Sequence, residues 1–335
     1  MYEGNLFGQE RIVIVIRYEF MDLSIQKESI HPESIFENER ELAQKFISRL
    51  KIDPKIQTCP VCGGARNEIL FKKWGIPYAT CSHCWSASLS ISPDSHTITR
   101  YFYESKLSQL RASRDYQQLV SNNRRELWEH QIGWIEGRIG RYLGNSKYSV
   151  IDWGSKFVGW TDSLGTASFV EKLDVEEPLP PILRPDREKE EANIVCLMDV
   201  LQRISHPQEE LNKIHRRLSP EGLLIVTCRA GSGFDILTLR ENSYSIFPLD
   251  HILLPSPKGM EVLLDEAGFD VLEITTPGLF DMKYIQKAKA HIPKDQYFAR
   301  YITDLDDDLI LERMQGFLQR NNLSSHVRCV AKRRS

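Results

Sequence analysis

Four cysteines in one short window have the spacing of a zinc site. Cys59 and Cys62 form one Cys-x2-Cys pair, Cys81 and Cys84 form a second, and eighteen residues separate the pairs. Each pair can occupy a tight turn that directs both sulfurs at one ion, and four thiolates close a tetrahedral site with no open position for water. We therefore predict one structural Zn²⁺ held by these four residues.

The segment that contains these cysteines, residues 57–98, is polar and rich in small residues, so it lacks an apolar core of its own. Structural zinc in small modules contributes about 10–16 kcal/mol of folding free energy. The sequence thus predicts a zinc-dependent module, which a chelator should unfold before the rest of the chain. The remaining cysteines lie in apolar, strand-like runs and are expected in the core; they are Cys196, Cys228 and Cys329.

A second stretch has the pattern of a nucleotide-binding turn. Residues 151–160 read IDWGSKFVGW, an apolar strand that ends in Asp152 and is followed by Gly154. In a strand–turn–helix nucleotide site, glycine permits the tight turn, and an acidic residue after the next strand binds the ribose hydroxyls. Asp174 is our candidate for that acid, with Glu171 as the alternative.

The elements that would position these residues alternate between apolar strands and helices. From Tyr148 onward, runs such as YSVID, NIVCLM and GLLIVT are separated by helical stretches. Strands that are apolar throughout and separated by helices are typical of a parallel sheet with helices on both faces. We therefore predict an α/β fold with a Rossmann-like, doubly wound and mostly parallel sheet.

Helical patterns also occur before and within this region. Residues 32–50 have the spacing of an amphipathic helix, and residues 99–144 form a second helical region. Two further helical stretches lie between Pro277 and Leu323, ahead of a last strand, HVRCVAK. One apolar stripe of the second region consists of Trp128, Ile132, Ile135, Ile139 and Tyr142.

These patterns predict four parts of the chain. The first is an N-terminal segment with the amphipathic helix, residues 1–56, and the second is a zinc-ribbon module, residues 57–98. A helical connector, residues 99–147, leads to the sheet domain, residues 148–335. A helical insertion at about 278–322 interrupts the last two strands of that domain.

The order of elements from Tyr148 onward resembles that of class I S-adenosylmethionine-dependent methyltransferases. Asp152-Trp153-Gly154 matches the start of their first motif, Asp-x-Gly-x-Gly-x-Gly. NIVCLMDVL (193–201) matches their fourth strand, and RRLSPEGLLIVT (216–227) matches the helix, turn and fifth strand. The resemblance implies an S-adenosylmethionine site that includes Asp152, Gly154, Lys156, Asp174 and Asp199.

Residues 251–278 are similar to a narrower group, the zinc-ribbon-bearing methyltransferases of nucleotide-sugar and surface-polysaccharide pathways, which also carry an N-terminal CPxCG...CxxC motif. The resemblance runs from Cys59 to the C-terminus. It implies a small-molecule acceptor such as a nucleotide sugar. It also implies a catalytic role for His251, which aligns with a histidine of that group and lies beside Asp250, although a lone histidine is more often structural.

The chain departs from the pattern of these methyltransferases at the cofactor turn. Lys156 and Val158 replace the second and third glycines of the motif. The methyl donor is a sulfonium cation, so a lysine ammonium about 4 Å from it would cost about 4 kcal/mol at an effective dielectric of 20. The short, proline-rich segment 176–191 also leaves little room for the usual helix and third strand.

A second departure concerns the catalytic base. Relatives often carry Glu-His after the fourth strand, whereas this chain has Gln202 and Arg203 there. Neither side chain accepts a proton near neutral pH. Two functions therefore stay open: a methyltransferase, or a catalytically degenerate protein of that fold that acts as a binding or partner subunit.

Composition limits the partners. The 335 residues carry a formal net charge of -3, with 43 Lys and Arg against 46 Asp and Glu, so nucleic acid or an anionic membrane is not an expected ligand. The apolar run RIVIVIR (11–17) is too short to span a membrane, and acidic residues precede it where a signal peptide would be basic. We expect a cytoplasmic protein, whose translation starts at Met1 or at Met21.

Overall fold

The structure is a computed structural model, which describes residues 32–47, 58–91, 114–155, 160–176 and 190–334, with a few single positions between 92 and 113. The run at 11–17 and the alternative start at Met21 lie outside the described residues. The expected amphipathic helix is α2 (Pro32–Ile47). Its buried side chains Leu42 and Phe46 pack in one cluster with Ile76 and Tyr78.

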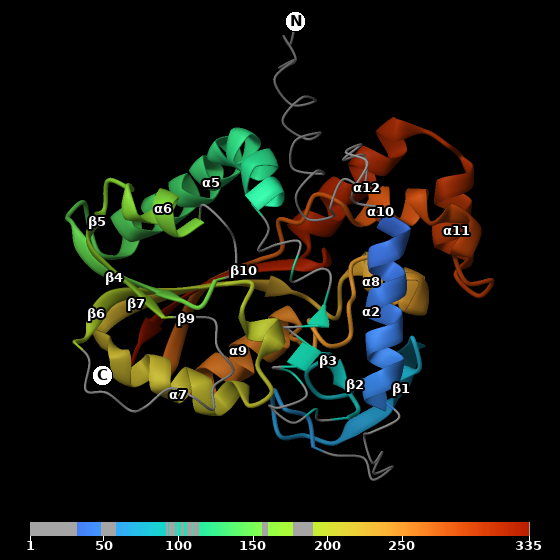
Figure 1. The fold of residues 1–335 in the computed structure, drawn as a ribbon, viewed down its shortest axis with the longest axis horizontal. Coiled ribbons are helices and arrows are strands. Elements are labelled where there is room, and N and C mark those ends of the chain that lie inside the picture. The colour runs from blue at the N-terminus through green and yellow to red at the C-terminus, as the bar shows by residue number, and fades with distance from the viewer. Residues whose placement is uncertain are drawn as a thin grey trace, which may run out of the picture.

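A six-stranded sheet forms the centre of the protein (Figure 1), in the order β5-β4-β6-β7-β10-β9. The first four strands of this order are parallel, and β10 runs antiparallel to both of its neighbours. The prediction of an α/β fold with a mostly parallel sheet is therefore confirmed. The strands are β4 (Tyr148–Trp153), β5 (Val170–Glu176), β6 (Ala192–Met198), β7 (Leu218–Arg229), β9 (Phe269–Thr275) and β10 (His326–Arg333).

Helices cover both faces of this sheet, as the apolar strands require. In Figure 1, α5 (Arg114–Tyr142) and α6 (Trp160–Gly165) lie above it, and α7 (Pro207–Arg217) and α9 (Pro257–Glu266) lie below. Successive strand residues alternate between the two faces. Val150, Ile194 and Ile225 pack on the α5 side, whereas Ile151, Val195 and Leu224 pack on the α7 side.

The expected apolar stripe of the second helical region lies on α5, where Trp128, Ile135 and Ile139 are buried. The insertion has three helices instead of the expected two, α10 (Asp281–Lys287), α11 (Tyr297–Asp304) and α12 (Asp308–Arg320). They share a separate apolar cluster with α8 (Phe234–Leu239). Short 3₁₀ helices are η2 (Leu201–Arg203), η3 (Arg240–Asn242) and η4 (Lys289–His291).

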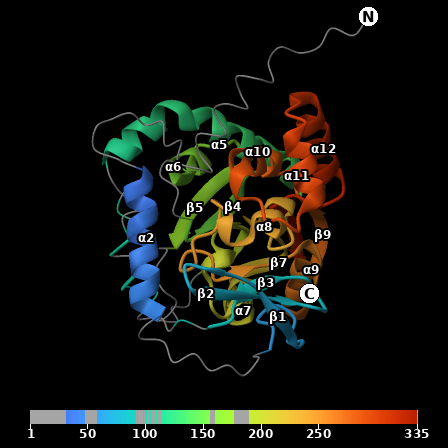
Figure 2. The same cartoon turned by 90° about the vertical axis from the view of Figure 1, so that its right-hand side faces the viewer.

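The cysteine segment forms a second, smaller sheet that is not made from its own residues alone. Its strands are β1 (Arg66–Lys73), β2 (Ile76–Cys81) and β3 (Ala87–Leu89), and β8 (Leu253–Leu254) from the sheet domain completes it in the order β1-β2-β3-β8. Figure 2 shows β1, β2 and β3 beside the lower part of the large sheet. The predicted boundary of the zinc-ribbon module at residue 98 stays a prediction. The module and the sheet domain nevertheless share this small sheet.

The proline-rich segment, residues 176–191, begins at the last residue of β5. From the sequence, this segment is too short for the usual helix and third strand. Residues 177–189 lie outside the described residues, and among the described strands β5 is the edge of the large sheet. Within the described part of the chain, no helix is both long enough and apolar enough to cross a membrane.

Close packing of α9 against the cysteine segment gives a first testable prediction. A methyl group at Gly259 would collide with the Ser86 hydroxyl and would lie 3.0 Å from Val61 Cγ1. We expect Gly259→Ala to lower the free energy of unfolding by about 1–3 kcal/mol, the usual effect of overpacking. The control is Gly133→Ala on α5, where nothing lies within 4 Å and alanine should stabilise the helix by about 1 kcal/mol. Denaturant unfolding of both variants measures the difference, and equal stability would contradict the packing described.

Candidate cofactor and metal sites

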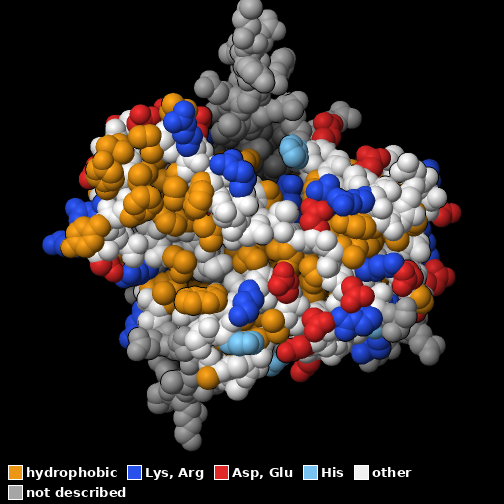
Figure 3. Space-filling view, turned by 180° about the vertical axis from the view of Figure 1, so that it is seen from behind, with side chains coloured by type: hydrophobic (Ala, Val, Ile, Leu, Met, Phe, Trp, Pro, Cys, Tyr) orange, Lys and Arg blue, Asp and Glu red, His pale blue; other side chains and the backbone are white. Residues whose placement is uncertain are grey.

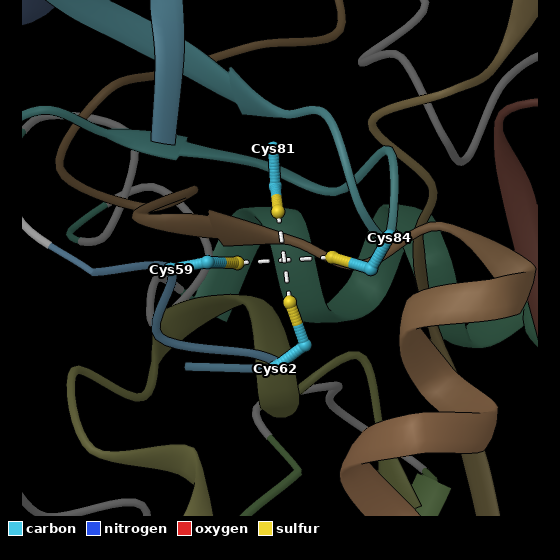
Figure 4. A group of neighbouring side chains, drawn as sticks. All are labelled: Cys59, Cys62, Cys81 and Cys84. Carbon is cyan, nitrogen blue, oxygen red and sulfur yellow. Dashed lines mark hydrogen bonds between the residues drawn. The ribbon is translucent and has the colours of Figure 1, made fainter. Parts of the chain in front are cut away.

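The four predicted zinc ligands lie together. Figure 4 shows their sulfurs pointing at a common centre, and all four lie within 4.8 Å of one another. The Sγ atoms of Cys59 and Cys84 are 3.7 Å apart, and those of Cys62 and Cys81 are 3.5 Å apart. Tetrahedral zinc with bonds of about 2.3 Å separates its sulfurs by about 3.8 Å. The arrangement therefore has the size of a zinc site with four thiolate ligands.

Two backbone turns create this arrangement. In the first turn, the Gly63 amide donates to the Cys59 carbonyl at 2.9 Å, and Gly63 has a φ of 64°. In the second, the Trp85 amide donates to the Cys81 carbonyl at 2.8 Å. Each turn brings both sulfurs of its Cys-x2-Cys pair to the same side, as the spacing predicted.

Burial and mutual hydrogen bonds shift the pKa values of Cys59, Cys62 and Cys84 in different directions. Hydrogen bonding from Cys59 lowers the pKa of Cys84 to about 4, whereas burial is the main reason that the pKa of Cys62 is raised to about 11. Four sulfurs this close repel one another as thiolates, so all four ionise only when a cation lies among them. The donor set is therefore suited to a dication that prefers sulfur.

Asp152 lies at the end of β4, where the nucleotide turn begins. Gly154 has a φ of 78°, a left-handed conformation that favours glycine. The Asp152 carboxylate is buried and accepts hydrogen bonds from the Ser155 hydroxyl at 2.6 Å and from the Thr161 hydroxyl at 3.0 Å. Burial raises the pKa of Asp152, and these hydrogen bonds oppose the rise. The carboxylate thus joins the turn to the start of α6.

Lys156, Val158 and Gly159, which follow in this turn, lie outside the described residues.

Asp174 lies within β5, two residues before its end. Arg217 at the end of α7 bonds to Asp174 Oδ2 at 3.2 Å and to Glu176 Oε1 at 2.8 Å. Glu171, the alternative ribose acid, is exposed. Glu176 was missed in the sequence, although its spacing of two from Asp174 places both on one face of the strand.

Asp199 follows β6 directly, and its φ of 51° is uncommon for a residue other than glycine. Its amide donates to the Thr227 carbonyl at 2.9 Å and to the Thr227 hydroxyl at 3.0 Å. Burial acts to raise the pKa of Asp199, but His326, Arg203 and Arg229 outweigh it and hold the pKa below its usual value. Asp199 is therefore an ionised, mostly buried carboxylate.

His326, the first residue of β10, was not identified in the sequence as a functional residue. Its Nε2 atom lies 3.6 Å from Asp199 Oδ1. The two residues meet because β10 is inserted between β7 and β9 and pairs His326 with Arg229. No local pattern in the sequence indicates this contact.

His251, the predicted catalytic residue, lies in a buried position. Its Nδ1 accepts a hydrogen bond from the Phe247 amide at 3.0 Å, and its carbonyl accepts one from the Tyr78 hydroxyl at 2.7 Å. Its neighbour Asp250 forms a buried ion pair with Arg203 at 2.7 Å. These contacts join the small sheet to the large one; the catalytic role of His251 stays a prediction.

Gln202 and Arg203 replace the expected base, and both have structural partners. The Gln202 side-chain oxygen accepts a hydrogen bond from the Arg229 amide at 3.0 Å. The Arg203 guanidinium donates to the Asp199 carbonyl and to the Asp250 carboxylate. The structure thus places no proton acceptor at these two positions.

These features define a class of protein. A mostly parallel sheet with helices on both faces and a positive-φ glycine turn after β4 is a Rossmann-like α/β domain. The family model described as methyltransferase domain matches residues 62–274. The chain belongs to this family.

Solved structures show similarity at low identity. Coclaurine N-methyltransferase, bound to N-methylheliamine and S-adenosylhomocysteine, is 13% identical with a TM-score of 0.36. The match covers 61% of this chain and 71% of that enzyme's chain. The plantazolicin methyltransferase BpumL is 10% identical with a TM-score of 0.38, and the match covers 72% of this chain and 100% of that of BpumL. A phosphoethanolamine N-methyltransferase of Haemonchus contortus is 15% identical with a TM-score of 0.37, and the match covers 59% of this chain and 51% of the Haemonchus chain. Similarity at this level carries no argument about activity. No curated protein matches the sequence.

Proposed function

We propose that the protein transfers a methyl group from S-adenosylmethionine to a nucleotide-activated sugar or another small polar metabolite. The observation that carries this proposal is the arrangement of acidic residues on three neighbouring parallel strands. Asp152 is the penultimate residue of β4, Asp174 lies on β5, and Asp199 follows β6, with β4 in the middle. Ligands of open α/β sheets bind at the carboxyl ends of such strands.

The residues present fit parts of the methyl donor to different degrees. Asp199 is an ionised carboxylate, which attracts a sulfonium cation. Asp152 and Gly154 shape the turn against which the donor would bind. Asp174 could accept hydrogen bonds from the ribose hydroxyls, although it shares Arg217 with Glu176. We also propose that Cys59, Cys62, Cys81 and Cys84 hold Zn²⁺ in a structural role.

A pair of variants tests the ribose acid. We expect Asp174→Asn to weaken binding of S-adenosylmethionine about 10- to 100-fold, because a hydrogen bond to a charged group contributes about 1.5–3 kcal/mol. The matched control, Glu171→Gln, changes an exposed carboxylate on the same strand and should leave the affinity unchanged. Calorimetric titration measures both, and the reverse result would assign the role to Glu171.

Lys156 decides whether the turn binds the donor well. If the ammonium faces the sulfonium, Lys156→Gly should remove a repulsion of up to about 4 kcal/mol and raise the affinity up to about a thousandfold. The uncharged product S-adenosylhomocysteine should gain much less from the same change, so titrating both ligands isolates the charge effect. A micromolar dissociation constant for S-adenosylmethionine in the native protein would mean that Lys156 points away.

The second candidate, a degenerate partner subunit, is favoured by an exposed apolar face. Tyr297, Phe298 and Tyr301 on α11 are 77%, 58% and 63% exposed. Figure 3 shows hydrophobic side chains gathered at the upper left, which is the rear of the α11 and α12 region. Patches of this kind mark interaction sites.

Two measurements separate the candidates. The partner subunit should bind neither S-adenosylmethionine nor S-adenosylhomocysteine, even as Lys156→Gly. Its sedimentation should also change when Tyr297 and Tyr301 become serine. A native protein that binds the donor and sediments as these serine variants do would exclude this candidate.

A further inference from the structure

The sequence leaves the proposed methyltransferase without a base at the usual place, and the structure supplies a histidine from elsewhere. Gln202 and Arg203 accept no protons and are engaged with Arg229 and Asp250. His326 reaches the same edge of the sheet from β10. Its side chain is 14% exposed, and that of Asp199 is 23% exposed, so both are accessible in part.

The backbone of Asp199 shows that its position is enforced. A left-handed conformation costs about 1–3 kcal/mol for a residue other than glycine, and such residues concentrate at functional sites. Hydrogen bonds from its amide to Thr227 hold the strained conformation. The result is a carboxylate whose buried Oδ1 has no hydrogen-bond partner among the described residues and lies 3.6 Å from His326 Nε2.

His326, together with the positive charges of Arg203 and Arg229, holds the pKa of this carboxylate below its usual value. Arg203 lies beside it on η2, and Arg229 ends β7 opposite His326. The backbone next to His326 is also held in place, because the Asp281 carboxylate on α10 accepts a hydrogen bond from the Ser325 amide at 2.8 Å. An ionised carboxylate against one ring nitrogen places the proton of neutral imidazole on that nitrogen and leaves the other as a proton acceptor.

We infer that His326 is the catalytic base of methyl transfer and that Asp199 positions it. This inference rests on the proposed function. The acceptor oxygen or nitrogen forms a bond to the methyl carbon, the bond from that carbon to the sulfonium sulfur breaks, and its electron pair stays on sulfur. The proton of the acceptor goes to Nδ1 of His326, and Asp199 stabilises the imidazolium through Nε2.

The first test needs no acceptor. Nitrogen-15 NMR of labelled histidine should show neutral His326 with its proton on Nε2, and Asp199→Asn should abolish this preference. His251 is an internal control, because its Nδ1 accepts the Phe247 amide and its proton should stay on Nε2 in both proteins. A proton on Nδ1 of His326 in the native protein would overturn the inference.

The second test follows the reaction. Transfer of radiolabelled methyl from S-adenosylmethionine is measured with UDP-, GDP- and dTDP-hexoses as acceptors. His326→Gln should lower kcat about 10²- to 10⁴-fold and leave the Kd for S-adenosylmethionine unchanged, while exposed His291→Gln should change neither. An unchanged kcat in His326→Gln would refute the base.

The two tests also separate this inference from the proposed function. If the native protein binds no S-adenosylmethionine and methylates none of these acceptors, the proposed function fails. The tautomer of His326 then still decides whether Asp199 orients it. If the native protein is active and only the His326 result is negative, the base alone is wrong.

Discussion

Removal of zinc is expected to unfold both sheets in one transition. Three of the proposed zinc ligands, Cys59, Cys81 and Cys84, belong to the same buried cluster as residues of the large sheet. The Ser256 hydroxyl donates to the Cys84 carbonyl and accepts from the Gly259 amide at the start of α9. Loss of a contribution of about 10–16 kcal/mol is as large as, or larger than, the total stability of a domain, which is usually about 5–15 kcal/mol.

This expectation differs from the independent module that composition suggests, because β8 and the common core join the two parts. The measurement is hydrogen exchange during titration with a chelator. Protection of β1 to β3 and of β6 and β7 should disappear at the same chelator concentration. Loss confined to the small sheet would show that the parts are separable.

A substitution tests the same point. Cys84→Ser should abolish zinc binding and folding together. Cys228→Ala removes a buried thiol of the large sheet that is not among the clustered sulfurs, so it should retain one zinc per chain and the fold. A folded, zinc-free Cys84→Ser protein would contradict the prediction.

Asp250→Ala is expected to lower the free energy of unfolding by about 3–5 kcal/mol, because it leaves the buried Arg203 guanidinium without its carboxylate. The two side chains are only 8% and 1% exposed. Replacing both at once, with Arg203→Met and Asp250→Leu, should recover most of this loss, since no uncompensated charge remains.

The exposed ion pair of Arg240 and Asp295 is the control. These side chains are 30% and 60% exposed, so Asp295→Ala should cost less than about 1 kcal/mol. Denaturant unfolding measures all the variants. If Asp250→Ala and Asp295→Ala lowered the free energy of unfolding equally, the buried ion pair would not be what holds η2 in place.

Local patterns were enough to predict that Cys59, Cys62, Cys81 and Cys84 lie together, and to predict most of the large sheet. The two Cys-x2-Cys turns depend on residues close in sequence, and strands such as β6 are apolar throughout because both faces are buried. Contacts between distant segments could not be predicted. The pairing of β8 with β3, the bond of Arg217 to the acids of β5, and the meeting of Asp199 with His326 follow from the topology.

His251 illustrates the same limit. Its alignment with a family motif depends on sequence neighbours, whereas the environment of its ring is set by the Phe247 amide and by packing beneath the small sheet. The motif could therefore indicate a position but not the partner of each ring nitrogen.

The place of β10 has a consequence for synthesis of the chain. Among the described strands, β9 lies at the edge of the large sheet with β10 as its neighbour, and the whole helical insertion is translated between the two. On the ribosome, β7 and β9 therefore expose unpaired edges until residues 326–333 emerge. Unpaired strand edges promote aggregation. A nascent chain that stalls within the insertion would thus be a substrate for chaperones, although most of its apolar core has already been made.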